Sequence, residues 1–353
     1  MALSLYLIGV PGAGKSTVFE ALTNTPQGPH FSNKGPHRLG TVKVPDERLD
    51  RLAEMYHPKK FTPAEVTFVD VGLPPGAQEQ RSFGEMTTFL GEADAFLLVV
   101  QVFGQFDYRG RPLDPQGQLE SALLELVVAD LDKVERRLER IVQERNRGTK
   151  GAEAEAALME RCKAELEHEV SLGALDFSEA EEKLLRGFRF LSQKPVLVVA
   201  NVEDGQNDVS ALERVCQQHG HQLLTFCAPI EAEIAQLDLG EQREFLQDYG
   251  LSEPARLRLI QAAYTLLNLI SFFTAGEDEV RAWTITRNTP AQLAAGKIHS
   301  DIERGFIRAE TVACEALFEL GSWSRCRDQG VLRLEGKTYP VQDGDTINFR
   351  FNT

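Results

Sequence analysis

No apolar run in this 353-residue chain approaches the roughly 20 residues that a membrane-spanning helix needs, which excludes an integral membrane protein. The N-terminal stretch lacks a basic leader and a small-residue cleavage site, so we expect no secretory signal peptide. Cysteine is scarce: the five residues are odd in number, scattered, and not at metal-ligand spacing. This usage is typical of reduced thiols and predicts a cytoplasmic protein without a cysteine metal site. They are Cys162, Cys216, Cys227, Cys314 and Cys326.

Positive charge is also in deficit, because 38 Lys and Arg residues face 53 Asp and Glu residues, for a formal net charge of -15. A surface of that sign does not attract nucleic acid as a whole, so any RNA contact requires a local basic patch. The length favours two or three domains, at the usual roughly 100 to 200 residues for each.

Short apolar runs alternate with helical stretches along much of the chain. Three runs lie in the first 102 residues, and two later runs have the same character. Continuous apolar strands separated by helices are typical of a mostly parallel sheet covered on both faces, which makes this an α/β fold. The runs are Leu3–Ile8, Val66–Val69, Ala95–Val102, Pro195–Ala200 and Leu223–Cys227.

Residues 118–193 are different, being rich in Glu, Arg, Leu and Ala. An apolar stripe at helical spacing, with a turn at 147–151, predicts an inserted helical hairpin of coiled-coil type. Its basic residues interleave with acids, which favours a solvated face over an RNA-binding stripe. The basic residues are Lys133, Arg136, Arg137, Arg140, Arg145, Arg147 and Lys150.

The last part of the chain changes character again after a helical run over 254–269. Alternating residues at 280–285 and 346–351 predict half-buried strands of a small mixed domain. Trp283 and Phe306 could stack on RNA bases, but their strand spacing favours a place in the core of that domain.

The pattern Gly-x-x-x-x-Gly-Lys-Ser occurs between a predicted strand and a predicted helix over Lys15–Leu22. That context is typical of a phosphate-binding loop, in which backbone N–H groups and the helix N-terminus face the phosphates. A glycine-rich turn without a ligand would not explain Lys15 or Ser16. We expect nucleotide contacts from Gly9, Pro11, Gly12, Ala13, Gly14, Lys15, Ser16 and Thr17.

Two further segments complete the predicted site. Asp70 follows a predicted strand and is expected to hold Mg²⁺ together with the Ser16 hydroxyl. Asn201, Val202 and Asp204 follow another strand, where the Asp204 carboxylate could accept hydrogen bonds from a guanine base. GTPases carry a lysine at the position of Val202, so guanine specificity is weakened. Alternatively, Asn201 and Asp204 serve only the turn.

Several segments resemble the YchF, or Obg-like, family of P-loop ATPases of the TRAFAC class. They are 228–235, 272–285, 294–310 and 334–345, together with the Asn-x-x-acid loop and the helical insertion. The resemblance covers essentially the whole chain. It implies a Ras-like nucleotide-binding domain over 1–117 and 194–270, the helical hairpin over 118–193, and a ubiquitin-like β-grasp TGS domain over 271–353.

The resemblance also implies ATP, or GTP, with Mg²⁺ as ligands, and a ribosome or RNA partner bound through the hairpin and the TGS domain. We expect a monomer with no membrane contact. Gly72 is expected to sense the γ-phosphate, but the segment around it is one residue shorter than in the family. Leu73 takes the position of the glutamine that orients water in Ras-type enzymes, which implies slow hydrolysis.

Three functions remain open from the sequence. The first is a slow NTPase that regulates ribosome association. The second is a hydrolysis-poor binding module in which the nucleotide is a structural ligand, favoured by the altered switch segments at 31–37 and 78–86. The third, a nucleotide kinase, lacks an evident lid and acceptor site.

Overall fold

The structure is a computed structural model, and it describes residues 3–24, 37–71, 87–146, 153–205 and 208–352. The chain divides into two compact units. The first comprises residues 1–41 and 67–259, and the second comprises 42–66 and 260–353. Among the described residues, no helix is long and apolar enough to cross a membrane.

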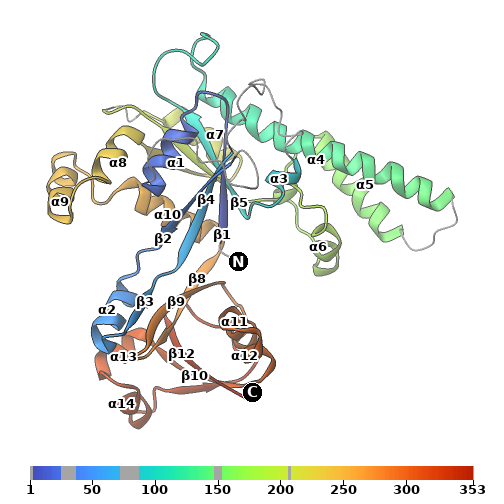
Figure 1. Ribbon diagram of the computed structural model, residues 1–353. Coiled ribbons are helices and arrows are strands. Elements are labelled where there is room, and N and C mark those ends of the chain that lie inside the picture. Colours follow the sequence, from blue (N-terminus) through green and yellow to red (C-terminus); the bar gives the residue numbers. More distant parts are fainter. Residues whose placement is uncertain (1–2, 25–36, 72–86, 147–152, 206–207, 353) are drawn as a thin grey trace. The chain divides into compact units, whose positions relative to one another are not determined.

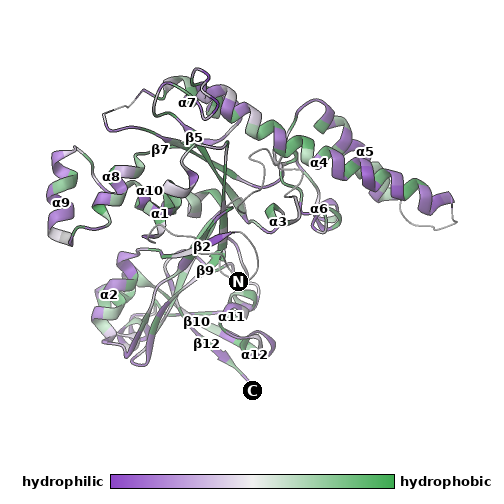
Figure 2. Ribbon diagram, turned by 45° about the horizontal axis from the view of Figure 1, so that its top comes forward, coloured by the Kyte–Doolittle hydropathy of each residue, from purple (hydrophilic) through white to green (hydrophobic). Residues whose placement is uncertain are grey.

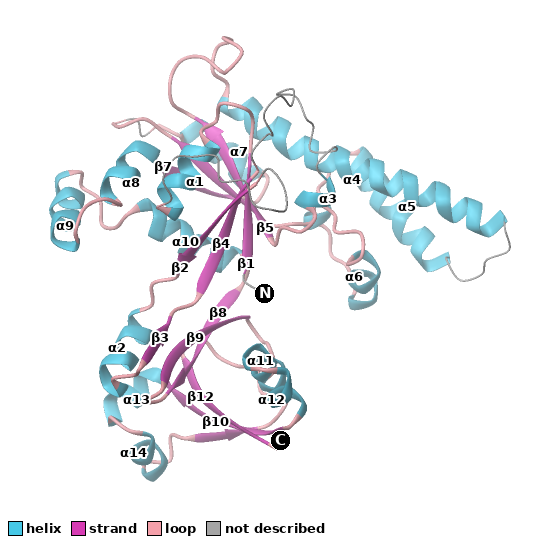
Figure 3. Ribbon diagram, in the orientation of Figure 1, coloured by secondary structure: helices cyan, strands magenta, loops and turns pink. Residues whose placement is uncertain are grey.

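The first unit is built on a six-stranded sheet in the order β2-β4-β1-β5-β6-β7 (Figures 1 and 3). Strand β5 pairs in parallel with β1 and β6, and β6 with β7, which confirms the predicted mostly parallel α/β sheet. All seven residues of β5 are buried, as expected for a central strand covered on both faces. The strands are β1 (Leu3–Ile8), β2 (Arg38–Lys43), β4 (Glu65–Asp70), β5 (Ala95–Gln101), β6 (Val196–Asn201) and β7 (Gln222–Phe226).

Helices of the first unit cover this sheet. One apolar core joins β5 and β6 to the first half of the long helix α4 (Pro115–Asn146) and to α7, through residues such as Leu126 and Leu212. The helix α1 packs with α8. The short helices are α1 (Lys15–Thr23), α3 (Thr87–Leu90), α7 (Ser210–Gln218), α8 (Ala228–Ile234) and α9 (Leu239–Asp248).

The predicted helical insertion is present. Helix α4 (Pro115–Asn146) lies beside α5 (Glu153–Glu167), followed by a 3₁₀ turn (Leu172–Ala174) and α6 (Glu179–Leu185) (Figure 1). In Figure 2, α4 carries hydrophobic and hydrophilic residues along its length, as an amphipathic helix must. Val134 and Ile141, which belong to the apolar stripe of α4, are buried together with apolar residues of α5 in a core that is separate from that of the sheet.

Basic residues of the hairpin pair with its acids. Arg137 contacts Glu155 at 2.6 Å and Glu144 at 2.9 Å, and Arg136 contacts Asp132 at 3.0 Å. These pairs take up cations that an RNA-binding stripe would need free.

The second unit contains another six-stranded sheet, in the order β11-β10-β12-β8-β9-β3. Its strands are β3 (Lys60–Thr62), β8 (Leu269–Ala275), β9 (Glu279–Thr286), β10 (Phe306–Ala313), β11 (Arg333–Glu335) and β12 (Asp345–Phe351). Its helices are α2 (Glu47–Tyr56), α10 (Ala255–Leu266), which begins in the first unit, α11 (Ala291–Ile298), α12 (Ser300–Arg304), α13 (Cys314–Leu320) and α14 (Trp323–Asp328). Phe306 is buried in one core of this unit and Trp283 packs against the same core, as their spacing predicts.

Residues 42–66 form α2 and β3 of the second unit, although the domain bounds expected from the sequence place them in the nucleotide-binding domain. The reason is a non-local strand pairing: Lys60 to Thr62 pair in parallel with Glu279 to Arg281. A three-residue edge strand has no periodicity that a sequence pattern could reveal.

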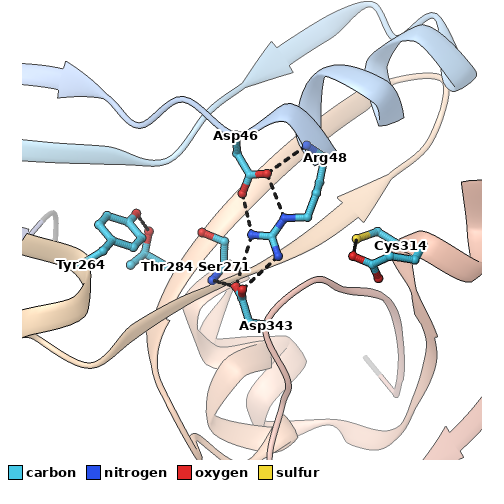
Figure 4. A network of polar contacts seen from close by, with 8 residues as sticks. Asp46, Arg48, Tyr264, Ser271, Thr284, Cys314 and Asp343 are labelled. Carbon is cyan, nitrogen blue, oxygen red and sulfur yellow. Dashed lines mark hydrogen bonds and ion pairs between the residues drawn. The ribbon is translucent and has the colours of Figure 1, made fainter. Parts of the chain in front are cut away.

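A polar network fixes this segment within the second unit (Figure 4). Arg48 donates to Asp46 and, through Nη1, to Asp343 at 2.9 Å, while Asp343 also accepts the Ser271 backbone N–H at 3.0 Å. The network lines a cavity of about 340 Å³ that also includes Tyr264. The polar groups of the network pair with one another, and we call Asp46, Arg48, Asp343 and Ser271 the Arg48 clamp.

Candidate functional site: the phosphate loop

The glycine-rich segment connects β1 to α1, as its pattern predicts. Gly9, Gly12 and Gly14 have φ angles of 140°, 79° and 87°, in the region that side chains rarely adopt. A Cβ atom on Gly9 would lie 2.3 Å from the Val99 carbonyl oxygen, so no other residue fits there. The loop therefore holds its backbone in the tight turn that aims N–H groups at an anion.

Lys15, the first residue of α1, folds its side chain back over the loop. Its Nζ donates to the Gly9 and Val10 carbonyl oxygens, each at 2.9 Å. Burial lowers the pKa of Lys15, and the charge of Asp70 opposes that effect. A desolvated ammonium group held only by carbonyl oxygens is suited to binding phosphate.

Asp70 ends β4 beside the start of α1 and is only 2% exposed. Burial raises its pKa, while a hydrogen bond from the Ser16 side chain and the charges of Arg38 and Lys15 lower it. Its Oδ2 has no hydrogen-bond partner among the described residues. A buried carboxylate oxygen without a partner beside a serine hydroxyl is a donor set that fits Mg²⁺.

Arg38 belongs to this site, although no sequence motif pointed to it. Its Nη1 contacts Glu20 at 2.7 Å and lies 3.8 Å from Asp70 Oδ2. The signal was weak because a single arginine on a short strand has no distinctive spacing.

The base loop, residues 201–204, meets the phosphate loop. The buried Asn201 side chain donates to the Ala13 carbonyl oxygen at 3.1 Å. Val202 is buried, and its N–H donates to the Phe226 carbonyl at 3.0 Å. Asp204 is exposed and free to approach a ligand, so the structure gives Asn201 a structural bond and leaves Asp204 available.

Gly72, Leu73 and most of the two altered switch segments lie outside the described residues. Within the part of the chain that is described, no group of three or more His, Cys, Asp or Glu residues could hold a metal ion on its own. A Mg²⁺ ion held by Ser16 and Asp70 would complete its coordination with phosphate oxygens or water.

The Ras-like sheet and the glycine loop with Lys15 define a P-loop NTPase. Comparison with known proteins shows to which family of P-loop NTPases the chain belongs. The chain is 38% identical to the protein named ribosome-binding ATPase YchF of Bacillus subtilis and 40% identical to that of Escherichia coli O157:H7, and each match covers 100% of both chains. The chain belongs to the YchF family.

Other comparisons agree with this assignment. Residues 269–352 match the YchF-GTPase_C family model, described as a protein of unknown function (DUF933). The fold is similar to the structure of the Schizosaccharomyces pombe YchF GTPase, with a TM-score of 0.84 and 28% identity over 99% of this chain and 97% of that chain. A GTP binding protein from Pyrococcus horikoshii shares the fold at 16% identity, with a TM-score of 0.63, covering 99% of this chain and 100% of that one.

Proposed function

We propose that this chain binds ATP, or GTP, with Mg²⁺, hydrolyses it slowly in the cytoplasm, and uses the bound nucleotide to control its association with ribosomes. The observation that carries the proposal is the constellation of Lys15, Ser16 and Asp70 around the glycine loop. It occurs in a chain that is similar over its full length to proteins named ribosome-binding ATPases.

Different residues of the chain bind the phosphates and the Mg²⁺ ion. The backbone N–H groups over 12–16 and the N-terminus of α1 bind the phosphates, with Pro11 and Thr17 flanking them. The Lys15 ammonium moves from the Gly9 and Val10 carbonyl oxygens to the β- and γ-phosphates. Ser16 and Asp70 would hold Mg²⁺, which would supply positive charge against the charge that develops on the phosphates.

Slow hydrolysis follows from Leu73, since a leucine side chain cannot orient the attacking water as a glutamine does. Gly72 would sense the γ-phosphate through its backbone N–H. In the base loop, Asn201 and Val202 form one side of the proposed binding site for the base. The exposed Asp204 carboxylate accepts from the base and decides between ATP and GTP.

The ribosome or its RNA would bind through the helical hairpin and the second unit. We assign the segment 271–353 of that unit to the ubiquitin-like TGS type, because its mixed sheet with α11 and α12 carries the segments that resemble that domain. The protein acts as a monomer in this proposal.

Ribosome co-sedimentation tests this function. The wild-type chain should sediment with ribosomes to a different extent with ATP than without it, and Lys15→Ala should lose that difference. Unchanged nucleotide dependence in Lys15→Ala would contradict the proposal.

A structural role for the nucleotide is the second candidate, favoured by the altered switch segments at 31–37 and 78–86. In that case ATP raises the melting temperature through binding linkage, while phosphate release stays at background. Turnover that is abolished in Lys15→Ala would exclude it.

A further inference from the structure

A surface loop over 102–113, between β5 and α4, is fixed at its base by one buried side chain. The Gln101 Nε2 donates to the Phe103 carbonyl at 3.1 Å and to the Phe106 carbonyl at 3.0 Å. The backbone N–H of Gln101 donates to Gln118 Oε1 of α4 at 3.1 Å. The loop therefore has a single conformation at its root.

Asp107 closes the tip of the same loop. Its Oδ1 accepts the backbone N–H groups of Arg109 and Arg111, each at 2.9 Å, and its Oδ2 accepts Arg111 Nε at 2.8 Å. Asp107 N also donates to the Arg111 carbonyl at 2.8 Å. The tip is a closed turn, so its side chains project from a fixed backbone.

The loop lies directly against the phosphate loop. A Cβ atom added to Gly12 would lie 3.0 Å from Cβ and 3.8 Å from Cγ of Tyr108, and one added to Gly14 would lie 3.6 Å from Phe103 Cε1. The Gly104 N–H donates to Glu203 Oε1 of the base loop at 3.0 Å. Tyr108 is thereby placed beside the residues expected to bind phosphate.

Arg109 is the unsatisfied cation of this loop. Its guanidinium carbon lies 5.1 Å from the centroid of the Tyr108 ring. Its side chain is exposed and makes no hydrogen bond or ion pair with any residue that the structure describes. Arg111, two residues on, is neutralised by Asp107 at 2.7 Å. The chain thus leaves Arg109 available and places it over the ring of Tyr108, whose Cβ lies close to Gly12.

We propose that Arg109 is a second phosphate-binding cation, held beside the phosphate loop by Tyr108, which adds to Lys15 in binding a nucleoside polyphosphate. The proposal rests on the nucleotide binding proposed above. A guanidinium can contact two phosphate oxygens at once. Stacking on an aromatic ring restricts the side chain before the ligand binds, so less conformational entropy is lost on binding.

The test is the affinity of the full chain for Mg·ATP, measured by calorimetry for wild type and variants. Arg109→Ala should weaken ATP binding by about tenfold or more, the effect of losing one charged hydrogen-bonded contact. Arg109→Lys should recover part of the loss, since lysine keeps the charge but not the planar fork. Arg243→Ala, an exposed arginine of α9, should bind as wild type.

A second measurement separates phosphate binding from a structural role. The melting temperature of nucleotide-free Arg109→Ala should be close to that of wild type, because the exposed side chain loses only its contact with the Tyr108 ring. A lowered melting temperature, or wild-type ATP affinity in Arg109→Ala, would overturn the inference. If wild type binds ATP and Lys15→Ala does not, only the role of Arg109 has failed. If wild type binds no ATP, the proposed function itself has failed.

Discussion

At the scale of single residues, Asn201 connects the base loop to the phosphate loop through one buried hydrogen bond. Gly14 must be a glycine for that bond to form, because a Cβ atom there would lie 2.2 Å from Asn201 Nδ2. The two segments proposed to recognise base and phosphate therefore share a hydrogen bond within the chain itself. A substitution of Asn201 should therefore affect both the phosphate loop and the base loop.

Asn201→Ala should lower stability by about 1 to 2 kcal/mol, since the Ala13 carbonyl loses its partner, and should weaken ATP binding. Asp204→Ala should change stability by no more than about 0.5 kcal/mol, because Asp204 is exposed, while it alters the ratio of ATP to GTP affinity. Urea unfolding and nucleotide titration of both variants measure these effects. Equal destabilisation by the two substitutions would contradict this division.

The cysteines allow a prediction from burial and pKa. Burial raises the pKa of Cys314 to about 12 and that of Cys162 and Cys216 to about 11, and Cys326 is also fully buried. The folded-state pKa of these thiols exceeds the unfolded value of about 9. As pH rises above 9, the thiols therefore ionise more readily in the unfolded chain, which lowers the free energy of unfolding. Stability should therefore fall between pH 9 and pH 12, the range in which thiols of the unfolded chain ionise first.

A thiol reagent at pH 8 measures the same property. The half-buried Cys227 should react first and the other four only on unfolding, since the thiolate is the nucleophile. Reaction of all five at one rate in the native protein would be inconsistent with their burial.

At the scale of elements, Asp130 anchors the helical hairpin to the sheet. This fully buried carboxylate on α4 accepts the backbone N–H of Leu191 at 2.8 Å and the N–H and hydroxyl of Ser192 at 2.7 and 2.8 Å. Those residues lead directly into β6, the strand that ends at Asn201. The hairpin is thus fixed at its root to a strand that reaches the proposed nucleotide site.

Asp130→Ala should destabilise the chain by about 3 kcal/mol, because it leaves several buried donors unpaired. Asp132→Ala, which removes only the exposed pair with Arg136, should cost about 0.5 kcal/mol or less. Denaturant unfolding compares the two. An equally small effect of Asp130→Ala would show that the donors find other acceptors.

The Arg48 clamp gives a matching prediction in the second unit. Asp343→Ala removes the acceptor of the Ser271 N–H and one carboxylate of Arg48, so we expect a loss of about 1 to 2 kcal/mol. Asp278→Ala breaks an ion pair whose side chains are 81% and 89% exposed, and should have no measurable effect. The urea midpoints of both variants provide the comparison, and equal midpoints would argue against the clamp.

At the scale of the whole molecule, the sequence patterns predict the long elements well and the non-local contacts poorly. The continuous apolar runs of β1, β5 and β6 and the periodic stripe of α4 are local signals, and each appears as expected. Residues 42–66 join the second unit through a three-residue strand, which no local pattern reveals.

The same distinction between local patterns and non-local contacts applies to the residues of the candidate site. The glycine loop is a contiguous motif, so its residues were identified from the sequence. Arg38 and Tyr108 carry no such motif, because each acts through a contact with residues distant in the chain, and the same holds for Asp130 at the root of the hairpin. Such contacts depend on how the strands assemble.

The central claim is that the loop around Lys15 binds a nucleoside triphosphate with Mg²⁺. Calorimetric titration of nucleotide-free protein with ATP and GTP, with phosphate release followed in the same samples, tests it most directly. We predict Mg²⁺-dependent binding with slow phosphate release in wild type, and an affinity lower by roughly a hundredfold in Lys15→Ala, whose lost ammonium makes several charged contacts. Absence of binding in wild type, or equal affinity in Lys15→Ala, would contradict the claim.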